Sequence, residues 1–111
     1  GVRGSPVIGA YCISKAADMQ LARNLALEYG PSNIRVNTIA PGLVKTDFAK
    51  ALWDDPKYLA KRLETAPLRR IGEPDDIGGL AVLLAGKAGA FITGQTLSVD
   101  GGPNLGGIDV D

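Results

Sequence analysis

Apolar residues in the first third of the chain recur with the spacing of a helix. The pattern is a repeat at steps of four, with alanines at the flanking positions: Ile13, Ala17, Leu21 and Leu25. It predicts a helix over residues 7–29, begun by Ser5-Pro6 and ended by Gly30-Pro31. The small side chains on its flanks would let another helix approach closely.

Two shorter segments are rich in β-branched residues and partly alternating, which is typical of strands. The first covers residues 34–40 and is followed by a Pro-Gly pair, and the second covers residues 94–100 and is followed by two glycines. Each strand is preceded by helical sequence. This order is the connectivity of a parallel α/β sheet.

The sequence between the two strands predicts further helices. Residues 45–70 are irregular, with apolar residues spaced as in one or two short helices that break near residues 54–56. A longer helix is predicted from Pro74, which precedes two acidic residues where the helix dipole favours negative charge. Gly78 and Gly79 inside it each cost about 1 kcal/mol relative to alanine. That cost is tolerable if this side of the helix packs tightly on a sheet.

A two-stranded parallel sheet is an incomplete structure. Parallel sheets are buried on both faces and seldom contain only two strands, so these elements alone would leave a sheet edge and apolar helix faces uncovered. We therefore expect the 111 residues to be the C-terminal portion of one larger α/β domain with a doubly wound parallel sheet. The glycine-rich tail at 103–111 is predicted to be flexible.

Composition and charge argue against several classes of function. The chain has 12 basic and 12 acidic residues, no His and one Cys. Balanced charge argues against a nucleic acid or an anionic membrane surface as a partner, and no apolar run is long enough to span a bilayer. A zinc or iron site would need carboxylates alone, so no metal is expected. The lone Cys12, for which we expect a structural role, is typical of an intracellular protein, and a cytoplasmic location is predicted.

Tyr11 and Lys15 are neighbours on one face of the first predicted helix, because they stand four positions apart. A phenol titrates near pH ~10, and an ammonium group beside it favours the phenolate and lowers that value. The pair therefore has the chemistry of a general acid/base. The spacing alone is weak support, because Tyr-x-x-x-Lys occurs by chance in about one chain in five of this size. An exposed Tyr beside a solvated Lys is the simpler explanation of the pair by itself.

Four segments, in order along the chain, resemble the short-chain dehydrogenase/reductase family. Together they cover nearly the whole chain up to residue 102. The segment YCISKAA (11–17) resembles the family's active-site helix, and NIRVN (33–37) leading to PGLVKT (41–46) resembles the strand and nicotinamide loop that follow it. The segment RIGEPDDI (70–77) resembles the closing helix of the family, and ITGQ (92–95) through to DGG (100–102) resembles its last strand.

The resemblance implies a Rossmann-type NAD(P)-binding domain that interconverts an alcohol and a ketone by hydride transfer with NAD or NADP. Tyr11 would be the general acid/base at the substrate oxygen. Lys15 would bind the ribose of the nicotinamide nucleotide and tune Tyr11. Members of the family assemble, so a homodimer or homotetramer is expected, with a small-molecule alcohol or ketone as the other partner.

The same resemblance assigns the segment that follows the first strand. Pro41 and Gly42 would shape the turn under the nicotinamide, while the backbone of Val44 and the hydroxyl of Thr46 would hold its carboxamide. Independently, the carboxyl end of a strand is where open α/β sheets bind ligands. Residues 45–70 correspond to a lid, in which three apolar side chains would cover the substrate and exclude water, although plain helix packing explains each one nearly as well: Phe48, Leu52 and Trp53.

Several parts of the family pattern are absent from these residues: the glycine-rich phosphate loop, the residue that selects NAD or NADP, the catalytic asparagine and the catalytic serine. Ser5 and Ser14 are too close to Tyr11 to replace that serine. A second hypothesis is therefore a non-catalytic fragment or a degenerate assembly partner, and we expect the isolated 111-residue chain to be inactive. Residues 41–53 and 69–74 look most like carbonyl reductases and 3-oxoacyl-carrier-protein reductases, from which no substrate follows.

Overall fold

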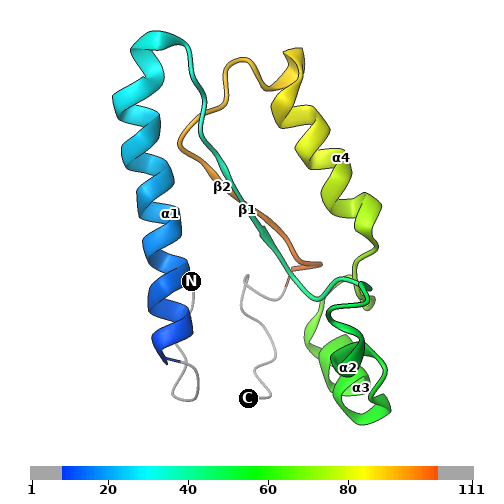
Figure 1. Ribbon diagram of the computed structural model, residues 1–111. Helices are drawn as coiled ribbons and strands as arrows, with labels where there is room; N and C mark the ends of the chain where they lie inside the picture. Colours follow the sequence, from blue (N-terminus) through cyan, green and yellow to red (C-terminus); the bar gives the residue numbers. More distant parts are fainter. Residues whose placement is uncertain (1–8, 103–111) are drawn as a thin grey trace. The chain divides into compact units, whose positions relative to one another are not determined.

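The computed structural model describes residues 9–102. Their helices and strands follow the predicted order, and the α/β fold class is confirmed (Figure 1). The helices, two single 3₁₀ turns and strands are α1 (Gly9–Tyr29), η1 (Gly30–Ser32), β1 (Thr38–Pro41), α2 (Lys50–Trp53), α3 (Pro56–Thr65), α4 (Pro74–Ala85), η2 (Lys87–Gly89) and β2 (Thr96–Val99).

The strands β1 and β2 form a two-stranded sheet. The N–H of Thr38 donates to the carbonyl of Gln95 over 2.8 Å, and four residues later the N–H of Gly42 donates to the carbonyl of Val99 over 2.9 Å. Both strands therefore advance in the same direction, and the predicted parallel pairing is confirmed.

Contacts between residues divide the chain into two compact units. The first contains residues up to Ile39 together with Val82–Leu97, and the second contains Ala40–Ala81 together with the residues from Ser98 onward. Each unit is described by itself below. The two strands and α4 contribute residues to both.

In the first unit, α1 ends where the sequence predicts. The single turn η1 follows Tyr29, and Asn33 closes that turn in a left-handed conformation (φ 60°). The proposed start at Ser5-Pro6 lies outside the described residues. The buried residues of α1 among those described are Met19, Ala22 and Ala26, and Ala26 lies against Gly94. Among the described residues a loop makes this close approach, and the approach of a second helix stays a prediction.

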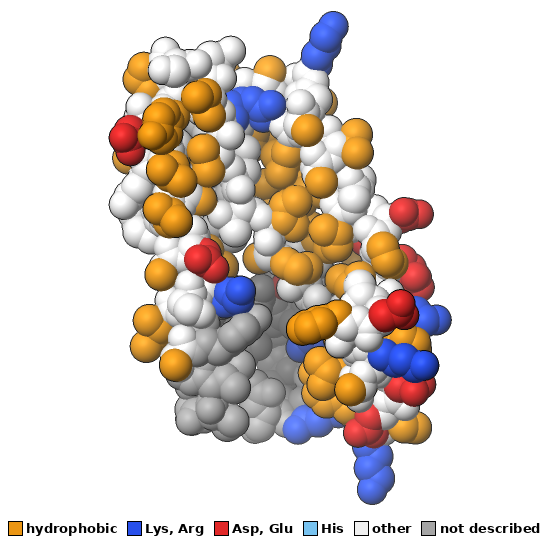
Figure 2. Space-filling view, in the orientation of Figure 1, with side chains coloured by type: hydrophobic (Ala, Val, Ile, Leu, Met, Phe, Trp, Pro, Cys, Tyr) orange, Lys and Arg blue, Asp and Glu red, His pale blue; other side chains and the backbone are white. Residues whose placement is uncertain are grey.

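Several of the larger apolar residues of α1 are exposed, whereas Met19 is buried and Leu25 is half-buried. Ile13 is 73% exposed, Leu21 is 56% exposed and Leu27 is 81% exposed. Figure 2 shows hydrophobic side chains along this helix, and the exposed members belong partly to the predicted repeat at steps of four. The repeat thus predicted the helix, but the buried face is the flank that carries Ala22 and Ala26.

The first strand is shorter than the predicted 34–40. Its backbone partners are partly replaced by side chains: Val36 donates its N–H to Thr93 Oγ1 over 3.0 Å. The amide of Asn37 donates to the carbonyl of Ile92 over 3.0 Å and accepts from the N–H of Gln95 over 3.1 Å. Residues 34–37 are therefore tied to the segment before β2 without forming a regular ladder.

Arg35 holds the end of α4. Its Nη1 donates to the carbonyls of Leu84 and Gly89, each over 2.6 Å. The last carbonyls of a helix have no partner within the helix, and a cation near them is favourable. Gly89 is buried, and a Cβ built on it would lie 2.7 Å from the carbonyl oxygen of Leu83. Only glycine allows this close return of the chain.

The second unit begins where β1 ends. The N–H of Lys45 donates to the carbonyl of Gly72 and the N–H of Gly72 donates to the carbonyl of Leu43, each over 2.8 Å, which makes a parallel bridge. A Cβ on Gly42 would lie 2.8 Å from the Cα of Asp100, so a glycine is required at this point of the loop.

The predicted break near residues 54–56 is confirmed, and it separates α2 from α3. Asp55 caps α3 by accepting the N–H groups of Lys57 (3.0 Å) and Tyr58 (3.4 Å), and Pro56 occupies the first helical position. At the other end of α3, Arg69 Nη1 donates to the carbonyls of Leu63, Glu64 and Ala66.

The described residues place no neighbour beside Gly78 and Gly79, so the tight packing expected for them stays a prediction. Both lie in α4, which begins at Pro74 as predicted, but a Cβ on either glycine would meet nothing within 4 Å. This face of α4 has no neighbour among the described residues. None of the helices in that part of the chain combines the length and apolar character needed to cross a bilayer.

Candidate functional site

Within the second unit, the loop after β1 is held by backbone hydrogen bonds to two other segments of the chain. Pro41 is the last residue of the strand, and Gly42 is hydrogen-bonded to Val99 of β2. Two residues after Gly42, Val44 forms an isolated parallel β-bridge with Gly72. The segment from Pro41 to Val44 therefore has a defined backbone at the carboxyl end of a parallel strand, which is where open α/β sheets bind ligands.

Thr46 ends this loop in a small network of hydrogen bonds. Its N–H donates to the carbonyl of Val44 (2.8 Å), and its carbonyl accepts from the N–H of Ala49 (3.1 Å) and from Nε1 of Trp53 (2.8 Å). Its Oγ1 accepts from the same N–H of Ala49 over 3.2 Å. Among residues 9–102, neither the N–H of Val44 nor the hydroxyl hydrogen of Thr46 is donated to an acceptor. The loop thus offers two unused donors.

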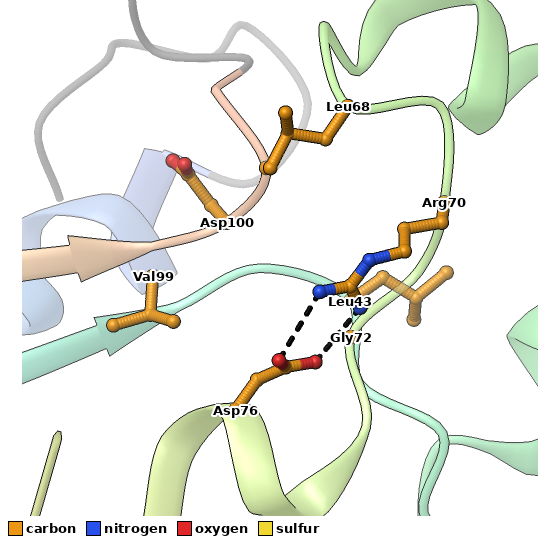
Figure 3. Close-up of a pocket in the computed structure, with 8 residues that line it drawn as sticks. Leu43, Leu68, Arg70, Gly72, Asp76, Val99 and Asp100 are labelled. Atoms are coloured by element: carbon orange, nitrogen blue, oxygen red, sulfur yellow. Dashed lines mark hydrogen bonds and ion pairs between the residues drawn. The ribbon is translucent and has the colours of Figure 1, made fainter. Parts of the chain in front are cut away.

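A small cavity of about 120 Å³ lies beside the loop, between the end of β2 and the beginning of α4 (Figure 3). Arg70 and Asp76 meet across it in a two-pronged ion pair, with Nη1–Oδ2 at 2.8 Å and Nη2–Oδ1 at 3.1 Å. The cavity is lined by Leu43, Leu68, Arg70, Gly72, Asp76, Val99, Asp100 and Gly101.

The electrostatics of this cavity are set by Asp76. The hydrogen bond from Arg70, together with the backbone N–H of Glu73 at 2.7 Å, lowers the pKa of the Asp76 carboxyl to about 2. The same pairing raises the pKa of the Arg70 guanidinium. Both groups are charged at neutral pH and satisfy each other, so the pair orders the turn into α4 rather than exchanging protons.

A larger cavity of about 610 Å³ lies in the lid region. Trp53 is part of its wall, with Lys45 Nζ 5.2 Å from the centre of its ring. Phe48 is fully exposed and Leu52 is 46% exposed, and neither lines this cavity. The full lining is Lys45, Trp53, Leu59, Leu63, Arg69, Arg70, Ile71, Glu73 and Asp76.

The predicted acid/base pair lies in the first unit. Tyr11 is in α1, and its side chain lies outside the part of the structure that is described. Lys15 is one helical turn further along, with Nζ 3.9 Å from Asp18 Oδ2 and both side chains largely exposed. The four positions Pro41, Gly42, Val44 and Thr46 are brought together in the second unit, separately from these two.

Two pairs of residues in the second unit were missed from the sequence. The bond from Trp53 to the carbonyl of Thr46 has no sequence signal, because it depends on how the turn between them closes. The Arg70–Asp76 pair could have been proposed from the opposite charges on either side of the Gly72–Pro74 turn.

A family model described as Enoyl-(Acyl carrier protein) reductase matches residues 1–104. The chain belongs to the short-chain dehydrogenase/reductase family. Dehydrogenase/reductase SDR family member 4 from Homo sapiens is 44% identical over 98 residues, and the protein of that name from Bos taurus is 42% identical over 97 residues. These alignments cover 88% and 87% of this chain but only 35% of each relative, so the chain spans about a third of their length.

Solved structures of the short-chain family agree with this assignment. A short-chain type dehydrogenase/reductase from Mycobacterium ulcerans is 36% identical with a TM-score of 0.88, over 94% of this chain and 38% of that one. A putative 2-deoxy-D-gluconate 3-dehydrogenase from Agrobacterium tumefaciens with bound NADP is 35% identical with a TM-score of 0.86, over 93% and 42%. The resemblance stated from the four sequence segments is confirmed, as is the fold that it implied.

Proposed function

We propose that residues 1–111 form the C-terminal part of a single Rossmann domain in an NAD(P)-dependent dehydrogenase/reductase that interconverts an alcohol and a ketone. The observation that carries this proposal is the loop from Pro41 to Thr46, which follows β1 and holds two unused donors. The family match extends over this loop and over Tyr11 and Lys15. The related protein from Agrobacterium tumefaciens, in its solved structure, holds NADP.

The donor set of the loop fits the carboxamide of NAD or NADP. The N–H of Val44 and the hydroxyl of Thr46 would donate to its oxygen, while Pro41 and Gly42 shape the backbone beneath the ring. Lys15 would bind the ribose. When bound, the nicotinamide nucleotide supplies or accepts a hydride. The residues of this chain hold it and fix which face of its ring is presented.

Tyr11 is the proposed general acid/base at the substrate oxygen. In reduction it would give a proton to the forming alkoxide, and in oxidation it would take one from the alcohol. Lys15 stands one turn away on α1, where its ammonium would stabilise the phenolate form of Tyr11. Its ion pair with Asp18 is long and exposed, so this pair contributes little to stability.

We further propose that residues 45–70 act as a substrate lid and that the protein forms a homo-oligomer. Phe48, Leu52 and Trp53 would cover a small apolar part of the substrate and exclude water from the reaction. The side chain of Phe48 is fully exposed in this structure, so covering a ligand would bury apolar surface that is now in contact with water. Exposed apolar residues of α4, Val82 and Leu83, are consistent with a homodimer or homotetramer.

The test is turnover by the full protein, meaning the complete polypeptide that contains these residues. We expect Tyr11→Phe to lower kcat for a panel of ketones by about 10²–10⁴-fold, the usual contribution of general acid/base catalysis. The dissociation constant of NADH or NADPH, measured by titration calorimetry, should change less than twofold. Tyr29→Phe is the matched control, because Tyr29 ends the same helix and is 43% exposed.

Two outcomes would contradict the proposal in different ways. Equal turnover by Tyr11→Phe and the unmodified protein would remove Tyr11 from the reaction. Cofactor binding without turnover of any carbonyl compound would favour the second hypothesis, in which the chain belongs to a non-catalytic assembly partner.

A further inference from the structure

Trp53 connects the lid to the loop that would hold the cofactor. It is the last residue of α2, and its indole Nε1 donates to the carbonyl of Thr46 over 2.8 Å. Lys45 Nζ lies 5.2 Å from the centre of the same ring, within the range of a cation–π contact. One side chain from the lid therefore contacts two consecutive residues of the loop.

The turn closed by Trp53 also determines whether the Thr46 hydroxyl donates or accepts a hydrogen bond on its outer side. The N–H of Ala49 donates to Oγ1 of Thr46 over 3.2 Å, so one lone pair of this oxygen is occupied. A hydroxyl carries one hydrogen and two lone pairs. With an N–H bound on this side, its hydrogen is free to point away from the turn, and Thr46 is set as a donor.

The helix that carries Trp53 cannot hold this geometry alone. It has four residues, Lys50–Trp53, and helices of this length are unstable in water without outside contacts. Its outside contacts in the second unit include the indole bond and the two bonds from Ala49 to Thr46. The loop and α2 therefore stabilise each other, and loss of the indole donor should loosen both.

We propose that Trp53 is a positioning residue for nicotinamide binding: its indole N–H fixes the Thr46 carbonyl, which orients the Thr46 hydroxyl toward the carboxamide. This proposal rests on the proposed function, because Thr46 must contact the cofactor. Other large apolar residues of the lid do not share the role, since Phe48 and Leu52 are exposed and make no such bond to the loop.

The experiment is a double-mutant cycle in the full protein, read as the dissociation constant of NADH and NADPH by titration calorimetry. We expect Trp53→Phe to weaken binding about three- to tenfold, the range of one hydrogen bond's net contribution. If Trp53 acts through the Thr46 hydroxyl, then Trp53→Phe in a Thr46→Val background should add less than a twofold change. Full additivity of the two substitutions, or no effect of Trp53→Phe, would overturn the proposal.

Two further variants distinguish the hydrogen bond of the Trp53 indole N–H from the packing of the indole ring. Benzothienylalanine at position 53 keeps the shape of tryptophan and replaces the N–H by sulfur, so it should weaken cofactor binding as much as Trp53→Phe. Lys45→Met removes the charge above the ring and keeps the indole bond, so its effect should stay below twofold. Benzothienylalanine with native affinity would show that the ring only packs, which overturns the proposal.

Failure of this proposal can be told apart from failure of the proposed function. If Thr46→Val leaves the dissociation constant unchanged, Thr46 does not hold the cofactor, and both that assignment and the role of Trp53 are overturned. If Thr46→Val weakens binding while Trp53→Phe acts additively, only the role of Trp53 is lost. The turnover of Tyr11→Phe reports on the acid/base assignment independently of both results.

Discussion

Each compact unit uses an arginine to hold the end of a helix, but the two arginines act over very different distances along the chain. In the first unit, Arg35 reaches the carbonyls of Leu84 and Gly89, which are 49 and 54 residues away in the sequence. In the second, Arg69 reaches carbonyls at the end of α3 that are three to six residues away. Arg35 is half-buried and Arg69 is exposed.

The difference separates a scaffold from a segment that can move as one piece. Bonds such as those of Arg35 and Asn37 join distant parts of the chain, so they cannot open without disturbing the first unit. The proposed lid, residues 45–70, is held mainly by local bonds, including Thr46 with Trp53 and Asp55 with Lys57. Local bonds can persist while the whole segment shifts, which is the behaviour expected of a substrate lid.

The largest effect that tests this contrast is expected at Arg35. Arg35→Met keeps the apolar stem but removes both bonds to part-buried carbonyls, and should lower the free energy of unfolding by about 2–3 kcal/mol. Arg69→Met is the matched variant and should cost about 0.5–1 kcal/mol, because two of its three bonds, those to Leu63 and Glu64, are exposed to water. Urea denaturation of the full protein measures both. Equal losses for the two variants would remove the distinction between scaffold and lid.

A smaller effect is expected at the cap of α3. Asp55→Ala removes the acceptor for the N–H groups of Lys57 and Tyr58 and should cost about 1 kcal/mol of local stability. Hydrogen exchange should therefore accelerate over residues 57–65 and stay unchanged over residues 84–95. Asp54→Ala, one position earlier and without a role as the cap of α3, is the control. Faster exchange in both segments would mean that the lid does not open by itself.

The smallest effect concerns pH and the Arg70–Asp76 pair. The pKa of Asp76 is lowered from 3.8 to about 2, so the pair stabilises the folded state fully above pH 3.8 and loses this contribution as the pH falls to about 2. Because the side chain of Arg70 is 54% exposed and that of Asp76 is 32% exposed, water screens the pair and the change should be modest. Asp76→Asn should flatten the stability profile between pH 4 and 2, and an unchanged profile would contradict the assignment.

Local sequence rules predicted most of the elements. Asp55-Pro56 predicted the start of α3, Gly30-Pro31 the end of α1 and Pro74 the start of α4, because caps and breakers act through the nearest backbone. The start of β1 was placed too early. Residues that look like a strand, such as Val36, here bond to the Thr93 side chain, and no local pattern encodes a partner 57 residues away.

The candidate site was predicted unevenly for the same reason. Thr46 and Val44 could be named because the motif that contains them resembles a family pattern, and their contact with the carboxamide stays a proposal that their unused donors support. The bond from Trp53 could not be named, since it depends on the closure of a turn rather than on spacing.

Whether the loop after β1 holds the cofactor is tested most directly by hydrogen exchange of the full protein with and without saturating NADH or NADPH. We expect cofactor binding to protect residues 44–53, where Thr46 and Trp53 lie, while exchange over residues 84–95 around the Arg35 contacts stays the same. Unchanged exchange at 44–53 with the cofactor bound would show that this loop does not hold the nicotinamide.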